Sequence, residues 1–250
     1  MSLQAQQKNT AKESGNTSLL KNISLFSKLS DETIEEFLKS AQVIEYKKGH
    51  MLYLEDEAAK SFYIIKYGWV KLFHTTLDGF EAVVDILTTG HVFGKNAIFE
   101  QDTYSCTAQA VEDTKLVVIP ISVLKEQIQK NSQMAISMLS AMSRKTKKRE
   151  MDVEHLSIQS APQRIGCFLL RLCPLGKQRD ITLHLPYDKV LIASRLGMKP
   201  ETFSRALNTL KESTGIKING ARIDIDNINK LTGYCCGACS SHYPCEDTKY

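Results

Sequence analysis

The polar side chains gathered between residues 199 and 208 are of the kinds that read the edges of DNA base pairs. They are Lys199, Glu201, Thr202, Ser204, Arg205 and Asn208. An arginine guanidinium can donate two hydrogen bonds to one guanine, a carboxylate can accept from cytosine, and a hydroxyl can reach either kind of base edge. Glu201 and Arg205 lie one helical turn apart, so an exposed ion pair worth about 0.2–0.5 kcal/mol is the alternative. The combination of residue types favours DNA reading.

A second group of residues, near the C-terminal end, suits metal binding. Four of the chain's seven cysteines fall within 11 residues of a segment with too few apolar side chains for a core: Cys235, Cys236, Cys239 and Cys245. Thiolate ligands occur at such short spacings because one loop must surround one ion or cluster. Structural zinc would take Cys236, Cys239, His242 and Cys245. The same spacing also allows a reversible disulfide between Cys236 and Cys239, or an inert tail.

The elements that must position the DNA-reading residues are two short helical patterns between residues 187 and 213. They meet across Gly197-Met198-Lys199, which is the layout of a helix-turn-helix. The second pattern begins at Pro200, which is tolerated at a first helical position because its missing N–H has no helical partner there. Its apolar stripe recurs at i, i+3, i+4 and i+7 and consists of Phe203, Ala206, Leu207 and Leu210. The polar residues point away from this stripe, so we expect this helix to enter a major groove.

Charge and the following segment both support a DNA-binding role for this region. Residues 187–222 contain seven basic and three acidic residues, a net charge of +4, and the whole chain also carries only +4. The basic excess is therefore concentrated where DNA phosphates would be met. Alternating residues at 216–218 and 221–223 flank Asn219-Gly220, a type I′ turn signal. We therefore expect a small β-hairpin, or wing, directly after the reading helix.

Length and composition indicate a globular protein of two domains. The chain has 250 residues, of which 42% are apolar and 24% are charged, and these values allow substantial cores. It contains no run of about 18 apolar residues and no apolar N-terminal segment, so we expect a cytoplasmic protein without a transmembrane helix or secretory signal. Disulfide bonds are rare in that compartment, so the clustered cysteines are interpreted first as metal ligands or redox groups.

Hydrophobic periodicity divides the chain into five segments. They are a disordered tail at 1–18, a β-rich domain at 19–120, a dimerisation helix at 121–156, a DNA-binding domain at 157–232 and a cysteine-rich tail at 233–250. The first tail has almost no apolar residues, whereas the period-two runs and glycine turns that follow predict a β-barrel or β-roll. The helical pattern at 121–156 contains no Gly or Pro, and its apolar stripe would need a second chain to cover it.

The run Glu-Thr-Phe-Ser-Arg at 201–205 resembles the E-x-x-S-R recognition motif of the Crp/Fnr transcription regulators, in their Fnr/Dnr-like branch. The similarity extends from about residue 20 to 232. It implies an α+β fold with an N-terminal cyclic-nucleotide-binding-like β-roll, a long dimerisation helix and a C-terminal winged helix-turn-helix. It also implies that Glu201, Ser204 and Arg205 read a TTGAT half-site, and that a homodimer binds double-stranded DNA at a palindrome resembling TTGAT-N4-ATCAA, with RNA polymerase as a further partner.

The motifs of common enzymes are missing from the sequence. There is no P-loop, no G-x-S-x-G and no H-E-x-x-H, and the sequence reveals no base positioned beside a cysteine. We therefore do not expect an enzyme.

The segment that would bind a cyclic nucleotide departs from the family pattern, although residues 62–71 fit the family's β-roll. Residues 93–105 replace a pattern that runs F-G-E-L-A, a short loop and P-R-[AS]. Lys95 stands in place of the ribose-binding Glu, and Tyr104 stands in place of the Arg that would neutralise the cyclic phosphate. A buried phosphate without a cationic partner loses its main electrostatic anchor. We therefore do not expect cyclic AMP to bind.

The spacing Cys236-x2-Cys239-x5-Cys245 is similar to the N-terminal ligand run of Fnr, moved to the other end of the chain. Some Fnr-type regulators place their cluster cysteines C-terminally and use an Asp of the dimerisation helix as fourth ligand. The resemblance thus implies an iron–sulfur cluster of the 4Fe–4S type, with Asp152 or Cys235 as the fourth ligand. It also implies oxygen, nitric oxide or iron status as the signal. Zinc, a thiol switch and an inert tail stay open.

Two further interpretations of the chain stay open. Residues 106–111 are similar to the Dnr branch, whose members sense nitric oxide through haem, although no spacing singles out one of the six histidines as an axial ligand. The chain would otherwise be a non-DNA module whose roll binds a small ligand and whose C-terminal domain docks a protein. Cys106, Cys167 and Cys173 lie within apolar patterns and are expected in cores.

Overall fold

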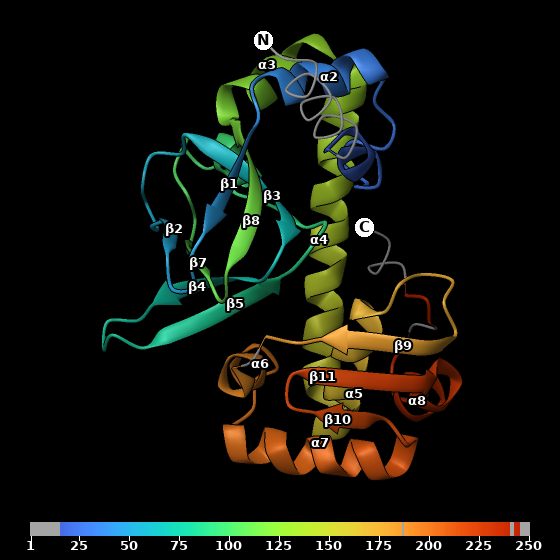
Figure 1. Ribbon diagram of the computed structural model, residues 1–250. Helices are drawn as coiled ribbons and strands as arrows, with labels where there is room; N and C mark the ends of the chain where they lie inside the picture. Colours follow the sequence, from blue (N-terminus) through green and yellow to red (C-terminus); the bar gives the residue numbers. More distant parts are fainter. Residues whose placement is uncertain (1–15, 187, 241–242, 246–250) are drawn as a thin grey trace, which may run out of the picture. The chain divides into compact units, whose positions relative to one another are not determined.

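A computed structural model describes residues 16–186, 188–240 and 243–245 (Figure 1). The chain divides into two compact units, with the boundary between Ser143 and Arg144 inside one long helix. Most of the tail predicted at 1–18 lies outside the described residues, and residues 16–21 are helical, so regular structure begins inside that range. No helix in the described part of the chain has the length and apolar character needed to cross a membrane.

The first unit contains the β-roll that the period-two runs predict. In the described residues it has two four-stranded antiparallel sheets, ordered β1-β8-β3-β6 and β2-β7-β4-β5. The strands are β1 (Gln42–Tyr46), β2 (Met51–Tyr53), β3 (Ser61–Tyr67), β4 (Val70–Thr75), β5 (Glu81–Leu87), β6 (Val92–Phe93), β7 (Thr107–Ala110) and β8 (Thr114–Pro120). Sequence patterns did not predict β6 and β7, which are short and lack an apolar run.

Strand β3 is buried on both faces, which explains its unbroken apolar run. Tyr63 and Ile65 belong to the cluster inside the roll, whereas Phe62 and Ile64 belong to a second cluster on the outer face of the sheet. Successive residues of a strand point to opposite faces, so one strand supplies both cores. The register with β8 continues the pattern, because Phe62 pairs with Ile119, another residue of the outer cluster.

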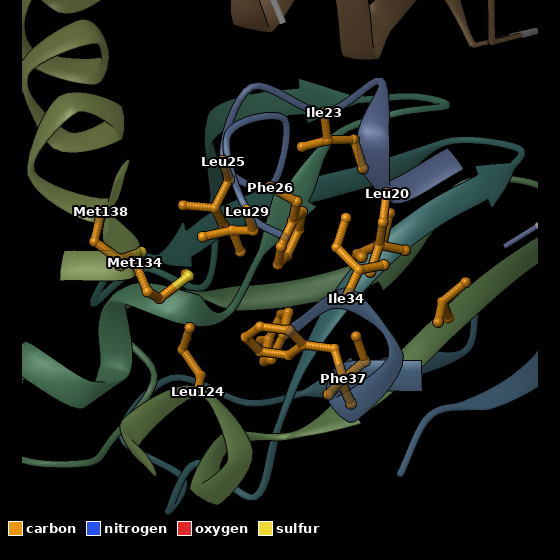
Figure 2. Packing of buried hydrophobic residues seen from close by; sticks show 14 residues of the cluster. Leu20, Ile23, Leu25, Phe26, Leu29, Ile34, Phe37, Leu124, Met134 and Met138 are labelled. Atoms are coloured by element: carbon orange, nitrogen blue, oxygen red, sulfur yellow. The ribbon is translucent and has the colours of Figure 1, made fainter. Parts of the chain in front are cut away.

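The outer cluster attaches the helices of this unit to the sheet (Figure 2). Helix α2 (Asp31–Lys39) begins after Ser30, whose side chain accepts a hydrogen bond from the Thr33 N–H. It buries Ile34 and Phe37, and Figure 2 shows both side chains pointing into the cluster. The capping signal in the sequence therefore marks the true start of this helix.

The single helix predicted at 121–156 is divided at Asn131. Helix α3 spans Ile121–Lys130 and contacts β3 and β8, and α4 spans Ser132–Ile158. Asn131 has an extended backbone, and its side chain accepts a hydrogen bond from the Gln133 N–H at 2.9 Å. Asparagine is favoured at such a position because it satisfies an N–H that the new helix leaves without a helical acceptor. The prediction of one continuous helix was therefore wrong, and α4 alone is the long helix.

The second unit consists of the last turns of α4 and a winged helix-turn-helix domain. Its elements are α5 (Ala161–Leu172), β9 (Arg179–His184), α6 (Lys189–Arg195), α7 (Pro200–Thr214), β10 (Lys217–Asn219), β11 (Arg222–Asn227), α8 (Ile228–Cys235) and η2 (Cys236–Ala238). In the part of the chain that is described, β10, β11 and β9 form a three-stranded antiparallel sheet in that order. Helix α5 contacts both α7 and α8. Strand β9 was not predicted from the sequence.

Candidate functional site

Helices α6 and α7 form the expected helix-turn-helix. Asp188 caps α6 by accepting hydrogen bonds from the N–H groups of Val190 at 2.9 Å and Leu191 at 3.4 Å. Gly197, in the turn, has a φ of +64°, a left-handed conformation that favours glycine. A Cβ atom at Gly197 would also lie 3.0 Å from Leu156 Cδ2. Glycine therefore allows both the reversal of the chain and the close approach of α4.

Helix α7 separates its apolar residues from the candidates for base reading. Its buried face, where no residue is more than 6% exposed, consists of Phe203, Ala206, Leu207, Leu210 and Thr214. The exposed side chains of the opposite face are Glu201, Ser204, Arg205 and Asn208. Lys199, at the N-cap, is exposed as well, and Thr202 is partly buried. The structure thus brings Glu201, Ser204, Arg205 and Asn208 together on the outward surface of α7, with Lys199 just before the helix. Figure 1 shows α7 at one edge of the unit.

The exposed ion pair that would be the simplest role for Glu201 and Arg205 does not form. Among the residues described, neither side chain takes part in a salt bridge. The carbonyl oxygen of Arg205 accepts a hydrogen bond from Thr209 Oγ1 at 3.2 Å, which involves only the backbone of Arg205. Both charged groups are therefore available to an external partner.

The basic surface of this region is centred on α6 and α7 rather than on the wing. Three of the seven basic residues between 187 and 222 have carboxylate partners: Arg195 with Asp152 at 2.7 Å, Lys217 with Asp226 at 2.9 Å and Arg222 with Asp224 at 2.9 Å. Two of these partners lie just beyond residue 222, so the count over 187–222 overstates the positive charge of the wing. The other four are exposed: Lys189, Lys199, Arg205 and Lys211.

The wing forms as predicted, but its turn is not of type I′. Asn219 pairs with Arg222 in the ladder, so the two turn residues are Gly220 and Ala221. The φ of Gly220 is +63°, and Ala221 does not have a positive φ. A type I′ turn needs positive φ at both central residues, whereas glycine at the first central position suits type II′. The turn is therefore shifted by one residue from the Asn-Gly pair that signalled it.

Cys235 is a core residue and not part of an exposed tail. It ends α8 and is fully buried. Its sulfur lies so close to α5 that a Cβ atom on Gly166 would be 2.1 Å away, so only glycine fits at that position. A hydrogen bond with Cys167 and burial together raise the pKa of the Cys235 thiol well above its ordinary value. The expectation that burial does not explain the clustered cysteines was therefore wrong for Cys235.

The other three clustered cysteines are partly buried and are not arranged around a common point. Cys239 Sγ lies 4.0 Å from the carbonyl oxygen of Cys236, and burial raises the pKa of the Cys236 thiol. His242, the nitrogen ligand of the expected zinc site, lies outside the described residues, whereas Cys245 lies within them. Within the described ranges, no three His, Cys, Asp or Glu side chains are placed to hold one metal ion. The described residues therefore do not form a metal or cluster site as they are placed here.

Asp152, the second candidate for fourth cluster ligand, already has two partners. One of its oxygens accepts a hydrogen bond from Arg171 and the other from Arg195, each at 2.7 Å. Two residues further along α4, the carboxylate of Glu154 accepts hydrogen bonds from both the N–H and the hydroxyl of Ser240, each at 2.8 Å. Sequence reasoning missed these contacts, because an excess of basic residues does not reveal which of them pair.

Aromatic side chains fill the interior of the β-roll. Tyr104 is 3% exposed, and its ring stacks on Tyr53 with 3.6 Å between the centroids. Its hydroxyl donates to the Ser61 carbonyl oxygen at 2.6 Å and accepts from the Ser61 N–H at 3.2 Å. Tyr63 and Phe93 stack beside this pair, with their centroids 5.0 Å apart. The residue in place of the family's phosphate-binding Arg is therefore a core residue that offers no cation to a ligand.

The other cysteines and Lys95, which the sequence also singled out, are partly or fully buried or bonded to the backbone. Cys167 and Cys173 are buried, as expected, whereas Cys106 is only partly buried. Burial raises the pKa of the Cys173 thiol to about 12. Lys95 begins the short helix η1 (Lys95–Phe99), and its ammonium group donates a hydrogen bond to the Val92 carbonyl oxygen at 3.3 Å.

Known proteins resemble both units. A family model described as "Cyclic nucleotide-binding domain" matches residues 43–131, and one described as "Crp-like helix-turn-helix domain" matches residues 163–234. The nitrogen fixation regulation protein FixK of Rhizobium meliloti is 30% identical over 77% of this chain and 87% of its own length. The fumarate and nitrate reduction regulatory protein of Vibrio cholerae is 28% identical over 76% and 78%.

A solved structure shares the arrangement of elements. FixK2 from Bradyrhizobium japonicum matches with a TM-score of 0.69 and 25% identity, over 80% of this chain and 99% of that one. The β-roll, the long helix and the winged helix-turn-helix thus occur in the order found in this family, whose members are transcription regulators and not enzymes. The chain belongs to the Crp/Fnr family of transcription regulators.

Proposed function

We propose that the protein is a homodimeric regulator that reads a TTGAT-like palindrome with α7. The observation that carries this proposal is the exposed face of α7, where Glu201, Ser204 and Arg205 stand over a buried apolar face. A helix held by one face can present the other to a major groove. Arg205 would donate to O6 and N7 of the half-site guanine, and Glu201 would accept from N4 of the cytosine paired with it.

Phosphate contacts would come from the exposed basic residues of α6 and α7. Lys189, Lys199 and Lys211 are exposed and make no ion pair within the described residues. Each phosphate that a protein neutralises steepens the fall of the affinity with salt, with a slope of about −0.9 in log–log form. The affinity of the protein for DNA should therefore fall steeply with salt, while its preference for the palindrome should depend on α7.

The test is binding of the purified protein to TTGAT-N4-ATCAA and to duplexes changed at single positions, at two salt concentrations. Arg205→Ala should weaken binding by about 1–3 kcal/mol and relax the choice at the guanine. Lys211→Ala is the matched control, because it should weaken binding to all sequences and reduce the salt slope by about 1. An Arg205→Ala protein with wild-type sequence preference would contradict base reading by α7.

Dimerisation is supported by apolar side chains left exposed along α4. Leu139 and Val153 share one heptad position and Met142 and Leu156 share another, and these four side chains are 37–65% exposed. Apolar residues at the two core positions of a heptad pack against a second helix. Val153→Glu should therefore shift the protein from dimer to monomer in sedimentation and abolish binding to the palindrome. A Val153→Glu protein that stays a dimer would remove this support.

We further propose that the C-terminal cysteines bind an iron–sulfur cluster through which oxygen, nitric oxide or iron status controls the regulator and its effect on RNA polymerase. The support is the sequence spacing of Cys236, Cys239 and Cys245. Their sulfur atoms would have to move closer together to bind one cluster. Anaerobically purified protein should contain iron and sulfide, and Cys239→Ser should lose both while Cys106→Ser keeps them. Protein that contains zinc and no iron would favour a zinc site over the cluster, and a haem absorption band would favour a haem sensor. Colourless, metal-free protein whose Cys239→Ser variant binds DNA normally would contradict any metal-based signal.

A further inference from the structure

Asp152, near the end of α4, connects three helices of the second unit. Its Oδ1 accepts a hydrogen bond from Arg171 Nη1 of α5, and its Oδ2 accepts one from Arg195 Nη2 of α6, each at 2.7 Å. The side chains of Asp152, Arg171 and Arg195 are 22%, 14% and 16% exposed. Charge-assisted hydrogen bonds are roughly twice as strong as neutral ones. This carboxylate therefore makes two strong, largely shielded contacts to different helices.

The charges of this network hold Asp152 in its ionised form. Burial alone would raise the pKa of Asp152, but the guanidinium groups of Arg195 and Arg171 outweigh burial and leave the pKa below its ordinary value. Removing one partner from a buried ion pair is strongly destabilising, because the other charge is left without compensation. The contacts of Asp152 are therefore expected to persist at neutral pH.

Arg195 lies at the joint between the two helices of the helix-turn-helix. It is the last residue of α6, and Gly197, two residues later, makes the turn that leads into α7. The Met198 N–H donates to the Ala193 carbonyl oxygen at 3.0 Å, which ties this turn back to α6. A displacement of the end of α6 at Arg195 would therefore also move the start of α7.

A second side chain of α4 reaches the same joint. Leu156 follows Asp152 by one helical turn and so lies on the same face of α4. A Cβ atom on Gly197 would lie only 3.0 Å from Leu156 Cδ2, so the Leu156 side chain packs closely against the turn. Leu156 is 52% exposed, and together with Val153, which is 64% exposed, it also belongs to the surface assigned to the dimer partner. The end of α4 thus contacts the helix-turn-helix beside the surface where a second copy would pack.

We propose that the Asp152–Arg195 pair is the joint that sets the orientation of α7 relative to the end of α4, and thereby the spacer length at which a dimer recognises its two half-sites. Arg171 is the second cation that keeps Asp152 in place. The inference rests on the proposed function for its DNA readout, and it makes Asp152 and Arg195 positioning residues without base contacts. A dimer must match the separation of the half-sites to that of its reading helices. An error in orientation therefore acts on the choice of spacer before it acts on the choice of base.

The test compares Arg195→Gln with Arg171→Gln. Both substitutions leave Asp152 with one arginine, and both remove a 2.7 Å contact of a similarly buried side chain, but only Arg195 belongs to the helix-turn-helix. The affinities for TTGAT palindromes with two, four and six base pairs between the half-sites should show a wild-type preference for four. Arg195→Gln should lose at least tenfold of that preference and Arg171→Gln less than threefold, with discrimination within the half-site unchanged in both. An Arg195→Gln protein that keeps the preference, or equal losses in both variants, would overturn the proposal.

A readout without DNA separates this inference from the proposed function. Amide hydrogen exchange at residues 194–199 should be at least tenfold faster in Arg195→Gln and unchanged in Arg171→Gln, and exchange in the β-roll should be unchanged in both. Arg195→Lys, which keeps the charge and can keep one hydrogen bond to Asp152, should restore part of the protection. If the wild-type protein binds no TTGAT palindrome, the proposed function fails and so does the spacer role. Wild-type exchange rates in Arg195→Gln would overturn the joint itself, whatever the DNA result.

Discussion

The β-roll and the helix-turn-helix unit hold their polar side chains in opposite ways. Inside the roll, the hydroxyl of Tyr104 is hydrogen-bonded to the backbone of Ser61 and its ring is stacked on Tyr53. The hydroxyl therefore already has its partners within the core. On α7, Glu201 and Arg205 point outward and make no ion pair within the described part of the chain. A polar residue in the roll therefore contributes to stability, whereas a polar residue on α7 is available for binding.

The difference matters because the roll matches a family model named for nucleotide binding and the other unit matches one named for the helix-turn-helix. In this chain the roll interior is an aromatic and aliphatic core that contains Tyr104, while the exposed face of α7 carries the E-x-x-S-R pattern of Glu201, Ser204 and Arg205. If the comparison is right, substitutions in the roll interior should change the free energy of unfolding, and substitutions on the outer face of α7 should change DNA affinity. Stability and DNA binding should therefore respond to different residues.

The largest difference in unfolding free energy should be between variants of two α7 residues that lie two positions apart on opposite faces. Phe203→Ala should lower the free energy of unfolding by about 3–5 kcal/mol, because Phe203 is 1% exposed and its removal leaves a cavity. Arg205→Ala should change it by no more than about 0.5 kcal/mol, since Arg205 is exposed. Urea unfolding of both variants checks this. A strongly destabilised Arg205→Ala would mean that Arg205 supports the fold, and the comparison would fail.

The second effect concerns the Tyr104 hydroxyl inside the roll. Tyr104→Phe should destabilise the protein by about 1–3 kcal/mol, because both the N–H and the carbonyl oxygen of the partly buried Ser61 lose a hydrogen-bond partner. Tyr67→Phe is the matched control, since Tyr67 is 64% exposed on the same strand as Ser61 and should show no measurable change. Thermal unfolding measures both. DNA affinity should stay at the wild-type value in each, and a selective loss in Tyr104→Phe would show that the roll interior communicates with DNA binding.

The parts of the molecule that could be predicted from the sequence are those where a period decides which way a side chain points. On α7 the 3.6-residue repeat of Phe203, Ala206, Leu207 and Leu210 assigns one face to the core, so the outward position of Arg205 follows at once. The strands with apolar runs were predicted for the same reason. Motif and periodicity therefore pointed to the same exposed face of α7, and its role in reading DNA stays a prediction.

The parts that could not be predicted depend on contacts between residues far apart in the chain. Cys235 looked like a metal ligand by type and spacing, but its burial depends on Gly166 of another helix. Asp152 looked like a possible fourth ligand, yet Arg171 and Arg195 hold it, and no local pattern connects these three positions. The break at Asn131 was missed because a single asparagine is compatible with a helix interior until its side chain caps the next helix.

Acid should reveal a third difference between the two units. The pKa of Asp152 lies below its ordinary value, so its stabilising contribution is fully present above the unfolded value of about 3.9 and is lost as the pH falls through the folded value. The difference in unfolding free energy between wild type and Asp152→Asn should therefore be largest near neutral pH and shrink below about pH 4. Calorimetry over pH 3–7 measures this difference.

The matched control for acid is an exposed carboxylate of the roll. A hydrogen bond from Lys47 lowers the pKa of Asp113, but both side chains are more than half exposed. Exposed ion pairs contribute little because water and salt screen them. Asp113→Asn should therefore show a much smaller difference from wild type at every pH. Equal pH dependence in the two variants would show that the buried network of the second unit is not special.

The smallest effect should come from the attachment of the cysteine-rich end to α4. The carboxylate of Glu154 accepts hydrogen bonds from the Ser240 N–H and hydroxyl, each at 2.8 Å, and these contacts are exposed to water. Glu154→Gln should leave the melting temperature unchanged but speed hydrogen exchange at the Ser240 amide, because a neutral amide oxygen is a weaker acceptor than a carboxylate. Glu150→Gln, one turn earlier on α4 and also exposed, should not alter that amide. If Ser240 exchanges at the same rate in wild type and in Glu154→Gln, contacts other than the Glu154 carboxylate attach this end of the chain to α4.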